Sequence, residues 1–96
     1  VSNGDNRGFI VEKEIIVHQP KKFVLNQAGL ESLQLTKREY QILQLIVQGY
    51  NNAEIASKLF LSISTIKTHV SNLYTKMNVK NRYKAIVMAK KMEIVA

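Results

Sequence analysis

Helix-start signals recur at short intervals in the last two thirds of the chain, and they constrain its fold more than any other feature. Thr36 followed by Glu39, and Asn51 followed by Glu54, both match the capping box, a reciprocal pair of side chain to backbone hydrogen bonds at a helix start. Gly49 stands between the two boxes, where it favours a left-handed helix end. The spacing predicts four helices of about 13, 8, 15 and 11 residues joined by tight turns.

Each predicted helix carries one apolar stripe, as helices around a common core do. Ser62 and Asn81 are the predicted caps of the third and fourth helices, which we expect at about 63–77 and 82–92. The fold class is therefore predicted to be all-α. The residues of the first three stripes are Ile42, Leu43, Ile46 and Val47, then Ile55, Ala56, Leu59 and Phe60, then Ile66, Val70, Leu73 and Met77.

Residues 1–34 lack these signals and are interpreted as an N-terminal extension or linker of unknown role. Phe9–Val17 and Lys22–Leu25 are apolar, β-branched runs on either side of Pro20, so a hairpin of short strands is one option. Ala28–Leu33 is expected to form a short helical turn. We place the domain boundary near Leu35, and residues 35–96 form the predicted functional domain. The chain does not begin with methionine, so we expect it to be a segment of a longer protein.

Positive charge is concentrated in the predicted helical domain. Residues 1–35 hold four cationic and four acidic side chains, whereas residues 36–96 hold ten cations and three acids, which accounts for the whole net charge of +7. Between residues 55 and 92 there are eight cations and no acid. A stretch of one sign inside a folded domain attracts polyanions, nucleic acid before anionic membrane, although a basic surface that serves only solubility is the simpler alternative.

The second and third predicted helices are separated by about three residues, which is the helix-turn-helix arrangement. At 100° per residue, the apolar seam of the third helix leaves an opposite face that is small, polar and free of acids. A helix needing only solubility mixes Glu and Lys on such a face. We therefore expect the third helix to enter the major groove of DNA. The predicted face consists of Ser64, Thr68, Ser71 and Thr75, with Lys67 and Asn72 on its shoulders.

Other side chains are predicted to contact DNA phosphates or to support the helices. The candidate phosphate contacts are Thr65, Lys58, Lys76 and Arg82, with plain surface charge as the alternative for the three cations. His69 is interpreted as a boundary residue that packs, because it points about 60° away from the core direction on the helical wheel. Glu39 is interpreted as a helix cap, because no second carboxylate or histidine stands near it in sequence. Tyr40, Tyr50 and Tyr74 are expected to pack in or beside the core.

The fourth predicted helix has apolar residues on two sides. Ala85, Ala89 and Met92 suffice to attach it to the core, while Val87 lies nearly opposite them on the helical wheel. Tyr83 and Met88 flank Val87, and an isolated exposed valine is the alternative reading. The sequence thus predicts a dimerisation surface of Tyr83, Val87 and Met88.

The helical region also resembles a known family. Residues 35–39 (LTKRE), 52–56 (NAEIA), 65–69 (TIKTH), 76–77 (KM) and 81–82 (NR), with Ile42, Leu43, Gly49, Leu59, Ser62, Val79 and Ala85, closely match the LuxR-type (FixJ/NarL-like) DNA-binding domain, in order and without gaps. The resemblance implies a four-helix domain at the carboxyl end of a bacterial transcription regulator, often a response regulator with a phospho-receiver domain. It implies that Lys67 and Thr68 face bases and that the fourth helix dimerises. Some relatives have lysine at the position of Ser71, so the serine implies one cationic contact fewer per subunit.

Other function classes fit less well. The chain has no cysteine and only two, distant histidines, which excludes thiol catalysis and argues against a metal site; we expect no catalytic residues and no cofactor. An RNA-binding module would show exposed stacking aromatics, and a membrane-surface bundle a broad apolar face beside its lysines. The expected partners are a double-stranded DNA operator, a second copy of the chain on that DNA and RNA polymerase, with no membrane. The expected compartment is the cytoplasm, and a ligand-responsive parent protein is the alternative to a phospho-receiver.

Overall fold

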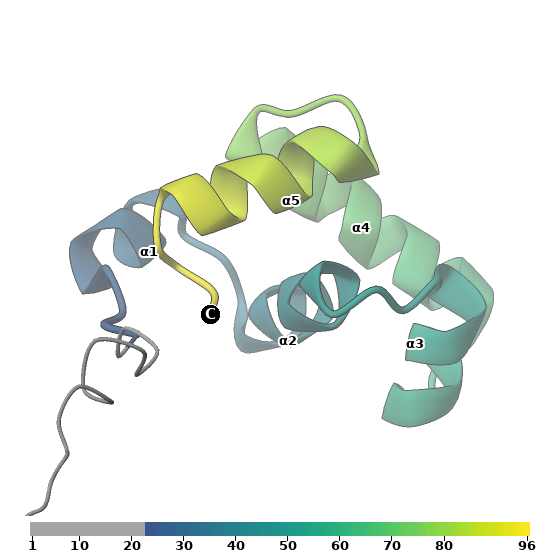
Figure 1. Cartoon of the computed structure of the whole chain (residues 1–96). Helices are drawn as coiled ribbons and strands as arrows, with labels where there is room; N and C mark the ends of the chain where they lie inside the picture. The colour runs from purple at the N-terminus through teal and green to yellow at the C-terminus, as the bar shows by residue number, and fades with distance from the viewer. Residues whose placement is uncertain (1–22) are drawn as a thin grey trace, which may run out of the picture.

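The computed structural model describes residues 23–96, which form five helices and no strand (Figure 1). The expected all-α fold is confirmed. The possible strand at 9–17 lies outside the described residues, and residues 23–25 of the second run belong to no helix or strand. The helices are α1 (Gln27–Leu33), α2 (Lys37–Val47), α3 (Asn52–Leu59), α4 (Ile63–Met77) and α5 (Arg82–Lys91).

The predicted helices begin where their capping residues stand. In α2 the Glu39 amide donates to Thr36 Oγ1 at 3.0 Å, and the Thr36 amide donates to Glu39 Oε1 at 2.9 Å. Asn51 and Glu54 form the same box at the start of α3. Gly49 has a φ of 101° and ends α2, as predicted. Local hydrogen bonds therefore fix the helix boundaries.

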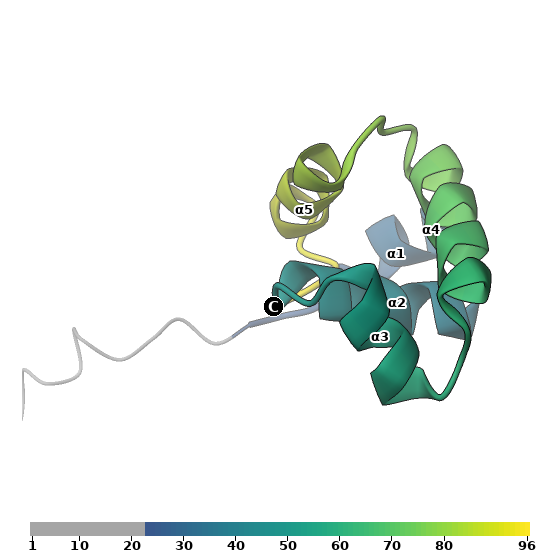
Figure 2. The ribbon, with the colours of Figure 1, turned by 90° about the vertical axis from the view of Figure 1, so that its right-hand side faces the viewer.

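The helices surround one apolar core. Helix α2 packs against α3, α4 and α5, and α3 packs against α4. Figure 2 shows α4 along one side of the molecule, with α3 at one of its ends and α5 beside the other. Because α2 touches three helices, it holds the helix-turn-helix pair and α5 in one unit. The core residues are Ile42, Leu43, Ile46, Ile55, Ala56, Ile66, Val70, Leu73, Met77, Ala85, Ala89, Ile94 and Val95.

Phe60 corrects the predicted stripe of α3. It was expected in the core, but its side chain is 93% exposed. The reason is that α3 ends at Leu59, and Phe60 adopts a left-handed conformation with a φ of 57° that takes its side chain off the buried face. The three tyrosines Tyr40, Tyr50 and Tyr74 are half-buried against the core, as expected.

Helix α1 lies before the predicted domain boundary and contacts the end of the chain. The Asn26 amide donates to the Glu93 carbonyl at 2.9 Å, and Asn26 Nδ2 donates to the Met92 carbonyl at 2.8 Å. The same side chain caps α1 by accepting from the Gly29 amide. The expected helical turn at 28–33 is confirmed, while the boundary near Leu35 stays a prediction.

Candidate nucleic-acid interface

Helix α4 has one buried face and one exposed polar face, as its sequence predicts. Ile66, Val70, Leu73 and Met77 point into the core. Together, the opposite face and its shoulders form what we name the polar face of α4. This face comprises the exposed residues Ser64, Thr65, Lys67, Thr68, Ser71, Asn72 and Thr75.

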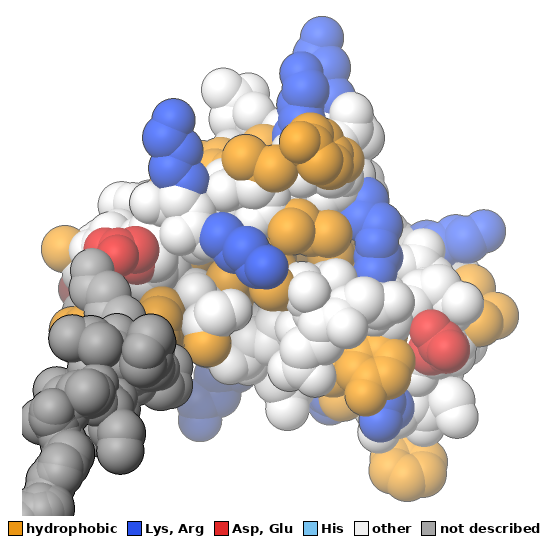
Figure 3. Space-filling model, viewed as in Figure 1, with side chains coloured by type: hydrophobic (Ala, Val, Ile, Leu, Met, Phe, Trp, Pro, Cys, Tyr) orange, Lys and Arg blue, Asp and Glu red, His pale blue; other side chains and the backbone are white. Residues whose placement is uncertain are grey.

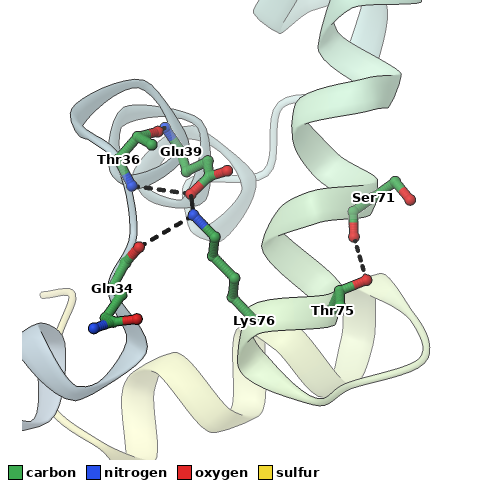
Figure 4. Close-up of polar contacts among 6 residues, drawn as sticks. All are labelled: Gln34, Thr36, Glu39, Ser71, Thr75 and Lys76. Carbon is green, nitrogen blue, oxygen red and sulfur yellow. Dashed lines mark hydrogen bonds and ion pairs between the residues drawn. The ribbon is translucent and has the colours of Figure 1, made fainter.

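Two hydroxyls of the polar face, those of Thr68 and Thr75, are held by local hydrogen bonds within α4. Thr68 Oγ1 donates to the Ser64 carbonyl at 3.2 Å. Thr75 Oγ1 donates to the Ser71 carbonyl at 3.0 Å (Figure 4). A threonine bound in this way uses its one O–H donor and keeps acceptor capacity on its oxygen. The small side chains of this face therefore allow the backbone of α4 to come close to base edges.

Lys67 is the cation of the polar face. Its side chain is exposed, and its ammonium group makes no hydrogen bond or ion pair with any of residues 23–96. At the beginning of α4, Ser62 accepts from the Thr65 amide at 3.1 Å and donates to Thr65 Oγ1 at 2.9 Å. Thr65 thus completes the helix start and remains exposed. An ammonium without a partner and a helix start without an acid can both receive an anion.

Lys76, predicted to contact phosphate, is engaged inside the protein. Its Nζ lies 2.7 Å from Glu39 Oε1 and donates to the Gln34 carbonyl at 3.1 Å (Figure 4). Glu39 is 3% exposed. Burial raises the pKa of its carboxyl, but Lys76 and the Thr36 amide outweigh burial and leave that pKa below its usual value. Lys76 therefore joins the end of α4 to the start of α2.

Arg82 and Lys58, two further predicted phosphate contacts, also have partners. Arg82 Nη2 donates to the carbonyls of Ile46 and Tyr50, and so connects the first turn of α5 to the end of α2. Lys58 Nζ lies 4.5 Å from the centre of the Tyr50 ring, a cation–π distance. Seven of the ten predicted DNA contacts thus share the polar face, and the other three lie off it and bind neighbouring parts of the protein.

Sequence reasoning did not find a groove of about 460 Å³ beside α4. It is lined by Gly49, Asn51, Asn52, Val70, Tyr74 and Arg82, which come from the α2–α3 turn, α3, α4 and α5. The sequence places these residues up to 33 positions apart, and no motif joins them. Only the packing of α3 and α5 against the rest of the bundle brings them together.

Two of the three predicted dimerisation residues are exposed on α5. Tyr83 is 74% exposed and Val87 is 44% exposed, whereas Met88 is half-buried against the core. Figure 3 shows hydrophobic side chains at the surface over α5, with Lys and Arg side chains around them. Ala85 and Ala89 attach the helix on its inner side. Tyr83 and Val87 are therefore available to a partner.

No group of three or more His, Asp or Glu side chains within 23–96 is arranged to hold a metal ion. No helix in this part of the chain is long and apolar enough to cross a membrane.

Comparisons with known proteins found a matching family and several similar proteins. A family model described as "Bacterial regulatory proteins, luxR family" matches residues 33–89, more than half of the chain. The response regulator protein VraR of Staphylococcus saprophyticus is 40% identical over 84 residues, which is 88% of this chain and 39% of VraR. The HTH-type transcriptional regulator MalT of Vibrio campbellii is 50% identical over 58 residues, which is 60% of this chain and 6% of MalT.

A solved structure is also similar. The crystal structure of ChrA, described as a response regulator in a heme-sensing two-component system, matches with a TM-score of 0.60 and 43% sequence identity. The match covers 62% of this chain and 30% of ChrA. The chain thus spans less than half the length of each of these relatives.

Proposed function

This chain belongs to the luxR family of bacterial regulatory proteins, DNA-binding transcription regulators with a helix-turn-helix, and we propose that α4 is the helix that enters the major groove. The observation that carries the proposal is the polar face of α4, which is exposed, built from small residues and free of acids. The family is one of regulators rather than enzymes, and we propose no catalytic activity for this chain.

We assign the base contacts to the N-terminal half and middle of α4. Lys67 has an ammonium without a partner among the described residues and can reach a guanine edge. Thr68, Ser64 and Ser71 lie beside it on the polar face. Small side chains at these positions allow the helix backbone to come close to the base pairs.

The remaining predicted residues are assigned to the DNA backbone. Thr65 and Asn72 are exposed on α4 and offer donors to phosphates. Thr75 is exposed as well, but its hydroxyl donates to the Ser71 carbonyl and must rotate away from it to bind a phosphate. Lys58, Lys76 and Arg82 keep unused donors after making their internal contacts: Lys76 has one of three left, and the Arg82 bonds involve Nη2 alone. We propose that these three cations add positive charge beside the DNA while holding the helices in place.

We propose that two copies bind adjacent half-sites and meet through α5. Tyr83 and Val87 supply exposed apolar surface there, with Met88 beside them. One such helix face buries well under the roughly 1,200 Å² of a stable complex, so the contact is expected to act only when DNA holds two copies close together. RNA polymerase remains the further partner we propose for the bound dimer.

We propose that the longer protein is a response regulator controlled by a phospho-receiver domain and working in the cytoplasm. VraR and ChrA are both described as response regulators, and both are longer than this chain. MalT is described only as a transcriptional regulator, so control by a ligand is the second candidate.

The test of the proposed function begins with selection of duplexes from a random library by the 96-residue chain. Lys67→Ala should weaken binding to the selected operator by about 1–3 kcal/mol and should not affect folding, because the side chain lies off the core. Lys91→Ala is the matched control, since Lys91 is an exposed lysine at the other end of the molecule, on α5. If the operator binds Lys67→Ala and the wild type equally, Lys67 is not in the interface.

A further inference from the structure

The groove beside α4 combines three polar side chains from different helices. Asn52 lies in the first turn of α3, Tyr74 in α4 and Arg82 in the first turn of α5. None of the six residues that line the groove is acidic. Each of the three side chains can donate a hydrogen bond, and one of them carries a positive charge. The groove therefore has the chemistry of an anion site.

Tyr74 contributes an unpaired hydroxyl group to the groove. It is half-buried, yet its hydroxyl makes no hydrogen bond with any of residues 23–96. Burial raises the pKa of Tyr74, which the positive charge of Arg82 opposes in part, so the hydroxyl keeps its proton at neutral pH. A buried tyrosine usually directs its hydroxyl to a partner. Here the hydroxyl is a free donor close to a guanidinium group.

The position of the groove relative to Lys67 indicates which anion it receives. At 100° per residue from Ile66, Lys67 points to about 100° and Tyr74 to about 80°, so both lie on one shoulder of α4. A helix of about 10–12 Å fills a major groove about 12 Å wide, so its two shoulders face the two sugar-phosphate strands. With Lys67 at the bases, Tyr74 and the groove face one of those strands.

We propose that the groove seats one backbone phosphate of the DNA strand on the Lys67 side of α4. The Tyr74 hydroxyl and the Arg82 guanidinium donate to the phosphate oxygens, and Asn52 supplies a further donor. Arg82 can do so without releasing the Ile46 and Tyr50 carbonyls, because both are bound by Nη2 and its other N–H groups remain. This inference rests on the proposed placement of α4 in the major groove.

The test combines Tyr74→Phe with operator duplexes in which single phosphates are replaced by neutral methylphosphonates. Tyr74→Phe should lower the affinity for operator and for random DNA by the same factor, about tenfold, because a phosphate contact carries no sequence information. At one phosphate in each half-site the effects should not add. There, Tyr74→Phe should cost much less on the methylphosphonate duplex, because the acceptor charge is already lost and only a weaker, neutral acceptor remains.

Tyr40→Phe provides a matched control. Tyr40 is also half-buried, but its hydroxyl donates to the Ile94 carbonyl at 2.7 Å, inside the protein. Its removal should leave the methylphosphonate profile of the wild type unchanged. Circular dichroism should confirm that Tyr74→Phe is folded, which is expected because its hydroxyl has no partner in the described chain.

The outcomes separate this inference from the proposed function. If Tyr74→Phe binds as tightly as the wild type, or if its cost is the same at every methylphosphonate position, the phosphate does not occupy the groove, although α4 can still bind DNA. If the wild-type chain binds no duplex DNA, the proposed function fails and this inference fails with it.

Discussion

Replacing Lys76 with methionine should destabilise the protein, because it would leave the Glu39 carboxylate buried without its cation. Glu39 is 3% exposed, whereas the Lys76 side chain is 33% exposed. Breaking a fully buried pair costs about 3–5 kcal/mol, and breaking an exposed pair about 0–1 kcal/mol. Since one partner is buried and the other partly solvated, we expect a loss of about 2–3 kcal/mol in the free energy of unfolding.

The size of the described part of the chain converts this loss into a measurable shift. For a domain of 60–100 residues, each kcal/mol lowers Tm by about 4–8 °C, so Lys76→Met should melt about 8–24 °C below the wild type. The measurement is urea and thermal unfolding followed by circular dichroism at 222 nm. Methionine retains most of the apolar stem, so the variant tests charge rather than packing.

Two further variants identify the source of the effect. Lys80→Met removes an exposed lysine that makes no hydrogen bond or ion pair with residues 23–96, and it should stay within about 0.5 kcal/mol of the wild type. Glu39→Gln retains an oxygen for the Thr36 amide but removes the charge, so Lys76→Met should cost less in that background. If Lys76→Met unfolds like Lys80→Met, the ion pair does not stabilise the fold and the reasoning is refuted.

Three other predictions concern pH, dimerisation and salt. Because folding lowers the pKa of Glu39, its carboxylate stabilises the fold above the ordinary pKa of 4.5, and this stabilisation is lost as pH falls through the lower pKa of the folded state. Between pH 7 and pH 3, the urea midpoint should therefore fall less for Glu39→Gln than for the wild type. Parallel curves for the two proteins would contradict this. Val87→Glu should spare binding to one half-site but abolish cooperativity on a full site with half-sites about 10 base pairs apart; unchanged cooperativity in gel shifts would place the dimer contact elsewhere. If each pair neutralises about six to eight phosphates, the logarithm of the binding constant should fall with the logarithm of salt concentration at a slope of about −5 to −7, and a slope near zero would exclude the nucleic-acid function.

The boundaries of α2 to α5 could be predicted because the signals that set them are local. Thr36, Asn51, Ser62 and Asn81 all cap the helices that their sequences indicate. The polar face of α4 followed from the same reasoning, since one helical period fixes which side chains share a face. Lys67 and its neighbours are exposed together for this reason alone.

The partners of the cations could not be predicted, since they come from distant parts of the chain. Lys76 binds Glu39 across 37 positions, and Arg82 binds the Tyr50 carbonyl across 32. In the sequence each is simply a cation near the predicted interface. Helix ends that lack glycine could not be predicted either. Gln34 and Phe60 adopt left-handed conformations, which residues of these types rarely do. Phe60 was wrongly predicted in the core because its left-handed conformation was not foreseen.

The attachment of α1 makes it the part of the described chain that can open most easily. No residue of α1 is fully buried, and the hydrogen bonds that tie its ends to distant elements are those of Asn26 with residues 92–93 and of Lys76 with Gln34. Local unfolding of α1 therefore leaves the α2–α5 core intact, and its amides should exchange with deuterium well before those of α2 and α4. A force applied to the chain before Asn26 would detach α1 first and leave α4 folded.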